Sequence, residues 1–426
     1  MTSSSGSSGT DGRPARVLGT GDAAVIGLGA MIGAGVFAVF APAAQQAGGW
    51  MPAALLVAAV VAYCNATSTA RLAARHPQSG GAYVYGRERL GPVWGYLAGW
   101  SFVVGKVASC ALMALTFAAY VYPGFERPVA LAAVAAVTLV NYSGARASAR
   151  VTRVLLVAVL GVLAVVVAVT APSDAANVRG VLDFGSWPGF FGVLGAAGML
   201  FFAFAGYARV ATLGGEVREP ERSIPRAIGI AMAVALGVYL AVCVAVLAVL
   251  GPRRLAASTA PLADAVTVAG WPNLTPIVAA GAALACLGAL LSLSLGVSRT
   301  ALALAEDGHL PRALTAVHPR YGVPHRSALA VGAVVAALVL VLDVRAAVGF
   351  SSFGVLVYYA VANASALRLG PSEGRPLLLV PVVGLAGCVV LALSLPLPLV
   401  LGGAVMVGSG VAVWLARRGL SRVGTG

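Results

Sequence analysis

The sequence predicts an all-α polytopic membrane protein with twelve spanning helices. Of the 426 residues 60% are hydrophobic, only 10% are charged, and the mean hydropathy is +0.93. A soluble domain carries about 25% charged residues, so this composition excludes a set of soluble domains. The placement of the arginines between apolar runs gives the third observation, because basic loops orient a membrane protein.

Apolar runs separated by polar breaks define the expected spans, since a spanning helix needs about 20 apolar residues. The Ser/Gly-rich residues 1–18 are expected to be a disordered tail, and residues 419–426 form a second tail. No basic region precedes a short cleavable apolar stretch, so no signal peptide is expected. The twelve spans cover residues 21–47, 51–72, 92–122, 128–143, 150–171, 188–213, 225–250, 274–303, 327–343, 346–368, 376–395 and 397–416.

The basic residues predict the orientation of these spans. With the N-terminus in the cytoplasm, 21 of the 28 basic residues fall inside, 5 fall outside, and Lys106 and Arg209 lie within spans. Basic residues concentrate in cytoplasmic loops, so both termini are expected in the cytoplasm and the chain in the cell inner (plasma) membrane. The same bias accounts for the net charge of +14 without nucleic acid, for which no binding motif is present.

Cysteine and histidine patterns predict neither a metal site nor a cofactor. The five cysteines lie in apolar runs with no CxxC spacing, and the four histidines lie in polar loops with no HExxH motif. No nucleophile and base are clustered, so an enzyme is not expected. A channel would need a filter-like segment, and none is recognisable.

Two spans carry glycines that weaken a helix. Span 1 has Gly27, Gly29, Gly33 and Gly35 within nine residues, and span 6 has Gly206 beside aromatic residues. Each glycine costs about 1 kcal/mol relative to alanine inside a helix. Close packing of small residues is the alternative, because Gly29 and Gly33 have that spacing. The pairing of the first span with the sixth favours interrupted helices.

Interrupted helices at corresponding positions of two halves indicate a transporter site near the bilayer midplane. The N–H groups at the start of a half-helix suit a carboxylate, and the freed carbonyl groups suit an ammonium. This combination predicts a site for an amino acid zwitterion.

Four segments resemble the amino acid–polyamine–organocation (APC) superfamily of amino acid permeases over nearly the full chain. Residues 27–37 (GLGAMIGAGVF) resemble the first-helix motif of the family, and residues 76–85 (HPQSGGAYVY) resemble the family's segment before helix 3. Residues 201–206 (FFAFAG) resemble helix 6 of the family, and residues 215–226 (GEVREPERSIPR) resemble the cytoplasmic exit of that helix. The exit of helix 8 resembles residues 298–311 (SRTALALAEDGHLP). Their common order and spacing strengthen the resemblance.

The resemblance implies a LeuT-fold secondary transporter that works by alternating access. Its 5+5 inverted repeat would place helices 1–5 in residues 19–172 and helices 6–10 in residues 186–370. Two C-terminal helices, 11 and 12, would follow in residues 375–418.

The resemblance also implies a set of substrate-binding residues around the two interruptions. Backbone N–H groups of the first would bind the carboxylate, and backbone carbonyls of the second would bind the amino group. The Phe202 ring would close over the substrate as a gate, with ordinary packing as the alternative. The implied residues are Ile32, Gly33, Ala34, Gly35, Phe202, Ala203, Ala205 and Gly206.

Lys106 is the hypothesised coupling residue. Some family members carry a lysine in helix 5. The corresponding position in this chain falls near Val159 and is not a lysine. Lys106 is the only lysine in the chain. Lys106 lies near the centre of span 92–122, where a cation must face a cavity, a partner or the bundle interior. It would titrate during transport or act as a fixed charge where relatives bind sodium. The alternative is a lysine held by backbone carbonyls without a role in coupling.

Arg209 and Glu216 are assigned to the cytoplasmic gate. Arg209 lies seven residues before Glu216, about 10 Å deeper in helix 6, and snorkelling toward the cytoplasm is its alternative. Hydroxyls of Ser292 and Ser294 could ligate an ion, although such serines more often bond to their own helix.

No acidic residue lies near the middle of a span, which argues against polyamines and cationic amino acids. A neutral amino acid is therefore the expected substrate, and an acidic one is the alternative, given Lys106 and Arg209. Together with the resemblance, this predicts proton-coupled uptake of neutral amino acids, with sodium as the alternative ion. An obligate exchanger and a non-transporting amino acid sensor on the same fold are the alternatives. The sequence leaves the oligomeric state open.

Overall fold

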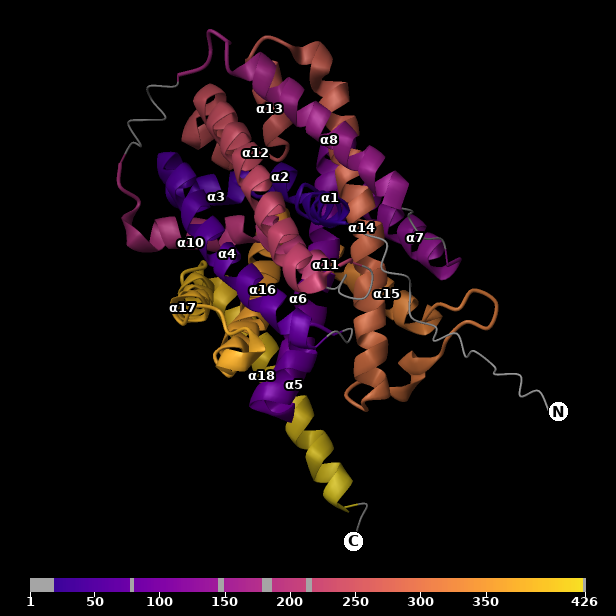
Figure 1. Ribbon diagram of the computed structural model, residues 1–426. Coiled ribbons are helices and arrows are strands. Elements are labelled where there is room, and N and C mark those ends of the chain that lie inside the picture. Colours follow the sequence, from indigo (N-terminus) through magenta and orange to yellow (C-terminus); the bar gives the residue numbers. More distant parts are fainter. Residues whose placement is uncertain (1–18, 77–79, 145–148, 178–185, 212–216, 424–426) are drawn as a thin grey trace, which may run out of the picture.

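The computed structural model describes residues 19–76, 80–144, 149–177, 186–211 and 217–423 (Figure 1). Every regular element in these ranges is a helix, which confirms the predicted all-α membrane fold. Nine helical segments in these ranges are long and apolar enough to cross a membrane. The count of twelve spans stays a prediction.

The helices follow the order of the predicted spans, with breaks inside the first and the sixth. Their bounds are α1 (Thr20–Met31), α2 (Gly35–Ala38), α3 (Phe40–Ala47), α4 (Met51–Arg75), α5 (Ala82–Leu90), α6 (Pro92–Val121), α7 (Glu126–Tyr142), α8 (Ala149–Thr170), α10 (Gly189–Phe204), α11 (Ala208–Ala211), α12 (Pro220–Ala257), α13 (Pro261–Val268), α14 (Thr275–Glu306), α15 (His325–Val341), α16 (Val344–Ala366), α17 (Leu379–Leu393) and α18 (Leu397–Val423).

Three predicted spans correspond to helices outside the set of nine. The helices α7 and α15 have 17 residues each, and α17 has 15 residues. At about 1.5 Å per residue, they measure roughly 22–26 Å, slightly less than the apolar thickness of a bilayer. Tilt, neighbouring helices and the bilayer itself accommodate such a difference.

Helix α6 forms the centre of the bundle and packs most extensively against α16 and α14. Gly105 of α6 and Gly354 of α16 make the close crossing possible. A Cβ atom on Gly354 would lie 2.9 Å from the Cα atom of Gly105, so only glycine fits. Helices α8 and α18 lie at the periphery, and the C-terminal part of α18 projects from the bundle (Figure 1).

Two short helices lie outside the predicted spans, at opposite ends of the bundle (Figure 1). Helix α5 is tied to the end of α14, because Tyr83 and Arg87 both donate hydrogen bonds to the Asp307 carboxylate. Helix α13 is tied to α6 at the other end. In the predicted orientation, α5 would be cytoplasmic and α13 would face outward.

Candidate functional site

The first span is interrupted at residues 32–34, between α1 and α2, as its glycines predict. Ile32 has φ −80° and ψ 66°, which ends α1. Its N–H group still donates to the Leu28 carbonyl at 2.7 Å, and the Gly33 N–H donates to the Met31 carbonyl at 2.8 Å. Two of the four predicted carboxylate-binding N–H groups are therefore bonded within the chain. The other two belong to Ala34 and Gly35, at the start of α2.

The sixth span changes from an α-helix to a single 3₁₀ turn at Ala205–Tyr207, between α10 and α11. This is a tight turn rather than a stretch of open backbone. The carbonyls predicted to bind an amino group have partners within the protein. The Phe202 carbonyl accepts from the Ala205 N–H, and the Ala205 carbonyl accepts from the Tyr359 hydroxyl at 3.4 Å. A 3₁₀ turn within a helix often marks a hinge.

The two interruptions touch each other because two glycines allow it. A Cβ atom on Gly35 would lie 2.9 Å from the Cα atom of Ala203. A Cβ atom on Gly206 would lie 2.6 Å from the Met31 nitrogen and would also meet the Ala30 carbonyl oxygen. No larger residue fits at either position without moving the backbone. The structure thus brings together the two segments that the sequence predicted as one site.

Tyr239 of α12 bridges the interruptions. Its hydroxyl lies 2.7 Å from the Met31 carbonyl oxygen and 2.9 Å from the Ala203 carbonyl oxygen, so its proton is shared between them. The side chain is buried. No sequence motif singles out Tyr239, although its residue type carries a signal. A tyrosine within an apolar span needs a partner for its hydroxyl.

Phe202 is buried in the hydrophobic core, with a relative exposure of 7%. Its neighbour Phe201 packs edge-on against Tyr359 with ring centroids 5.9 Å apart. This burial is compatible with packing and with a closed gate, so the gating role stays a prediction.

Lys106 lies inside α6 with a relative exposure of 9%. It is in none of the ion pairs found among the described residues. The lysine is therefore a buried cation near the middle of the central helix of the bundle. The backbone of Arg209 lies in α11, but its side chain and all of Glu216 lie outside the described residues. Their gating role stays a prediction.

Ser294 of α14 bonds to protein atoms on two sides. Its hydroxyl donates to the Leu290 carbonyl at 2.7 Å and accepts from the Asn141 side-chain amide at 2.7 Å. The hydroxyl thus bonds to its own helix, as serines in apolar helices commonly do, and this was the alternative to a role as an ion ligand.

Tyr120 closes the end of the bundle that carries α13. Its hydroxyl donates to the Phe37 carbonyl of α2 at 3.2 Å and accepts from the Leu262 N–H of α13 at 3.2 Å. The ring packs edge-on against Phe37 with centroids 5.6 Å apart. One side chain of α6 therefore fastens α13 over the second half of the interrupted first span.

A charged network joins α4, α5 and the turn after α16 at the opposite end. Arg89 forms a bidentate pair with Glu373 at 2.6 and 2.9 Å, and the Gly370 N–H donates to the same carboxylate at 2.8 Å. These bonds lower the pKa of Glu373 to about 2. Arg89 also donates to His76, and burial followed by the nearby Arg89 lowers the pKa of His76.

We expect Glu373→Gln to lower the melting temperature in detergent by about 2 °C at pH 7. A carboxyl group with a lowered pKa in the folded state adds stability above its ordinary pKa and loses it as the pH falls toward 2. The difference between wild type and variant should therefore shrink as the pH falls below about 4.5. Thermal unfolding from pH 3 to 8 measures it. Glu221→Gln, at an exposed position, is the control. Equal melting temperatures at pH 7 would contradict the prediction.

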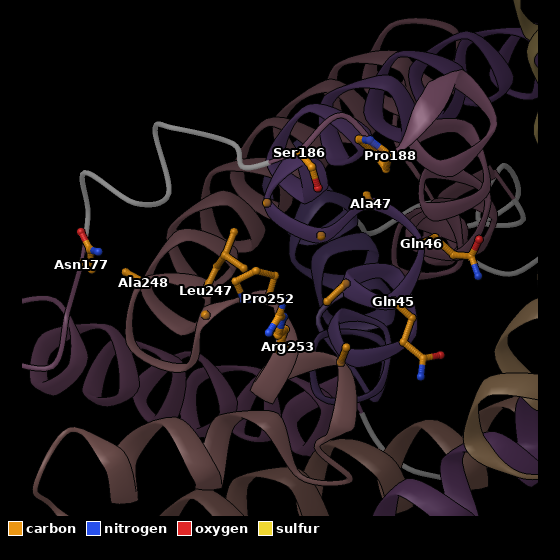
Figure 2. A pocket seen from close by; sticks show the side chains of 15 residues that line it. Gln45, Gln46, Ala47, Asn177, Ser186, Pro188, Leu247, Ala248, Pro252 and Arg253 are labelled. Atoms are coloured by element: carbon orange, nitrogen blue, oxygen red, sulfur yellow. The ribbon is translucent and has the colours of Figure 1, made fainter.

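A cavity of about 870 Å³ opens at the end of α3, beside the kink of α12 at Gly251. Figure 2 shows Gln45, Gln46 and Arg253 around it, with Ser186 and Pro188 on another side. None of the predicted substrate-binding residues lines this cavity. It is therefore separate from the paired interruptions.

Comparison with known proteins places the chain among transporters. The amino acid permease family profile matches residues 22–397. An uncharacterized transporter of Mycobacterium tuberculosis is 61% identical over 407 residues, which cover 96% of this chain and 92% of the relative. Cationic amino acid transporter 4 of Homo sapiens is 30% identical over 85% of this chain and 61% of the human protein. The branched-chain amino acid permease BcaP of Bacillus subtilis is 24% identical over 73% of this chain and 71% of BcaP.

The extent of the family match agrees with the fold. It spans all helices from α1 to α17, including both interrupted spans and the bridging tyrosine of α12. The chain therefore belongs to the amino acid permease family of the APC superfamily, which also makes it a multi-pass membrane protein.

Proposed function

We propose that this permease carries neutral amino acids into the cell across the plasma membrane, coupled to protons, by alternating access. The observation that carries the proposal is the contact between the two interrupted helices, which Tyr239 bridges at the Met31 and Ala203 carbonyls. In transporters built on inverted repeats, paired interrupted helices form the substrate site, and alternating access rocks one repeat against the other around that site.

In this proposal, the substrate carboxylate binds the N–H groups of residues 32–35, with Ala34 and Gly35 at the start of α2 as its main donors. The amino group binds carbonyls of residues 202–206. Tyr239 and Tyr359 already donate to the Ala203 and Ala205 carbonyls. A carbonyl oxygen can accept two hydrogen bonds, so the substrate's amino group would share these carbonyls with the tyrosine hydroxyls, which keep them in place.

The charges of the chain favour a neutral substrate. No carboxylate among the described residues is buried, so the bundle offers no partner to the second cation of lysine or arginine. A buried cation without a partner is costly. The relatives carry names of both classes, a cationic amino acid transporter and a branched-chain amino acid permease. The lack of a buried carboxylate favours the second class for this chain.

Uptake into proteoliposomes tests the proposal. The purified protein is reconstituted in sodium-free buffer, and radiolabelled amino acids are supplied with and without an inward proton gradient. We expect gradient-driven accumulation of neutral amino acids, branched-chain ones among them. Uptake only after the vesicles are preloaded with amino acid would indicate an exchanger. Binding without any uptake would indicate a sensor, and accumulation of lysine or arginine alone would contradict the substrate assignment.

Lys106 is the proposed coupling residue, because it is a buried cation near the middle of α6, the central helix of the bundle. Lys106→Met should lower gradient-driven uptake about tenfold or more, while exchange of substrate across the membrane persists. A neutral side chain can neither carry the proton nor replace the charge.

The variant Lys106→Arg separates the two roles left open for this lysine. Arginine keeps its proton, so it should restore uptake if Lys106 acts as a fixed charge and fail to do so if Lys106 titrates. Both variants are compared with wild type across external pH 5–8, at equal amounts of reconstituted protein. Full, pH-dependent uptake by Lys106→Met would exclude a role in coupling.

A further inference from the structure

Four buried polar residues lie on the packed helices α4 and α16, and two of them, Asn65 and Asn363, bond to each other across the contact. Asn65, Ser68 and Thr69 lie on α4, and Asn363 lies on α16; we call them the polar seam. None is more than 3% exposed. Asn65 is followed by Ser68 and Thr69 at positions i+3 and i+4, so all three occupy one face of α4. The seam does not belong to the predicted substrate site.

The hydrogen bonds of the two amides fix their orientation. The side-chain nitrogen of Asn363 donates to the Asn65 side-chain oxygen at 2.6 Å and to the Tyr359 carbonyl at 2.9 Å. The Cys388 thiol of α17 donates to the same Asn65 oxygen at 3.4 Å. Turning either amide over would break these bonds. This orientation leaves the Asn65 Nδ2 and the Asn363 Oδ1 without a hydrogen bond to any protein atom.

The two hydroxyls of the seam differ from most hydroxyls on the apolar helices. Ser68 Oγ and Thr69 Oγ1 are buried and bond to no protein atom. Elsewhere the hydroxyl usually donates to a carbonyl one turn earlier in its own helix, which satisfies it locally. Residues that do so are Ser109, Thr138, Thr170, Ser294, Ser298, Ser365 and Ser394.

The seam thus presents one amide donor, two hydroxyls and one amide acceptor, and the donor and both hydroxyls lie on one face of α4. A buried polar group without a partner is unfavourable in an apolar medium, and protein interiors satisfy such groups with protein atoms or with ordered water. A water molecule both donates and accepts. A monovalent cation would be bound by oxygen atoms alone, and it would leave the Asn65 amide hydrogens unsatisfied.

We propose that the polar seam binds ordered water, one or two molecules held by the Asn65 amide and the hydroxyls of Ser68 and Thr69. The site has a mechanical consequence. Asn363 bonds to the Tyr359 carbonyl, and the Tyr359 hydroxyl reaches the Ala205 carbonyl at the 3₁₀ turn of the sixth span. Water in the seam therefore supports the segment of α16 that contacts this hinge.

Substitution of Thr69 gives a test in which the sign of the effect decides. Thr69→Val keeps the shape of the side chain and removes the hydroxyl. If Thr69 Oγ1 holds water, the loss should lower the melting temperature by about 2 °C or more. If the hydroxyl is dry and unpaired, its removal should raise the melting temperature, which would overturn the proposal. Ser68→Ala should act in the same direction as Thr69→Val.

Thr170→Val is the matched control. Thr170 is equally buried, but its hydroxyl donates to the Val166 carbonyl at 2.6 Å within its own helix. Its substitution should change the melting temperature less than Thr69→Val does. An equal or larger loss at Thr170 would show that the effect at Thr69 reflects removal of any buried hydroxyl, and would overturn the assignment.

Two further measurements identify the ligand. An experimental structure at about 2 Å or better should show solvent density within hydrogen-bond distance of Asn65 Nδ2 and of one seam hydroxyl. A seam without density would overturn the proposal. Melting temperatures in potassium, sodium and choline chloride should be equal at one ionic strength. A rise in sodium or potassium that Thr69→Val abolishes would indicate a cation site and overturn the assignment of water.

Discussion

Gly206→Ala should reduce uptake about tenfold or more, the largest effect expected from removing or adding a single carbon atom in this chain. The added Cβ atom would lie 2.6 Å from the Met31 nitrogen and would meet the Ala30 carbonyl oxygen, both of them backbone atoms. Backbone yields less easily than the end of a side chain, and overpacking costs about 1–3 kcal/mol. About 1.4 kcal/mol changes an equilibrium constant tenfold, so a cost in this range would shift the packing of the two interruptions by about that factor.

Gly237→Ala is the control for this substitution. Gly237 lies in α12, and a Cβ atom there would meet nothing within 4 Å, so its uptake should equal that of the wild type. Uptake is measured at equal amounts of reconstituted protein, after size-exclusion chromatography has shown that each variant is folded. Wild-type uptake by Gly206→Ala would refute the close contact between the two interrupted spans.

Tyr239→Phe should lower the ratio of maximal uptake rate to KM about tenfold. The substitution keeps the ring and removes the hydroxyl that the Met31 and Ala203 carbonyls share. A buried polar group that loses its partner costs about 1–3 kcal/mol. Because the two carbonyls belong to the two interruptions, their relative position should become less defined, and the substrate should bind a less ordered site.

Tyr63→Phe is the matched control, since Tyr63 of α4 has a relative exposure of 53% and lies on the outer face of the bundle. Concentration dependence of uptake and thermal unfolding are measured for both variants. A purely structural role would lower the melting temperature of Tyr239→Phe while each folded molecule transports as well as the wild type. That result would remove Tyr239 from the transport site.

The interrupted spans show how much of the site can be predicted from the sequence. Gly27, Gly29, Gly33 and Gly35 predict a weak first helix, and the structure interrupts it at residues 32–34. The sixth span instead keeps a 3₁₀ turn, because Tyr239 and Tyr359 satisfy the carbonyls that open backbone would expose. The number of glycines in a segment indicates how unfavourable a continuous helix is there. It does not report which side chains from other helices arrive to replace the lost bonds.

The short helices give a second example. Helices α5 and α13 fall between the apolar runs, and no hydropathy signal marks them. Long-range bonds hold them, among them those from Tyr83 to Asp307 and from Leu262 to Tyr120. Such bonds join residues 224 and 142 positions apart, so a local pattern cannot contain them.

The amino-acid sequence by itself determined that this chain is a helical membrane protein with a permease motif, since hydropathy, arginine placement and short motifs are properties of successive residues. Only the tertiary structure decided which groups meet. Tyr239 lies 208 positions from Met31 and 36 from Ala203, yet one hydroxyl bonds to both. The polar seam likewise joins Asn65 and Asn363 across 298 positions. Packing of helices chooses those partners, because each buried polar group must find one within reach of its side chain.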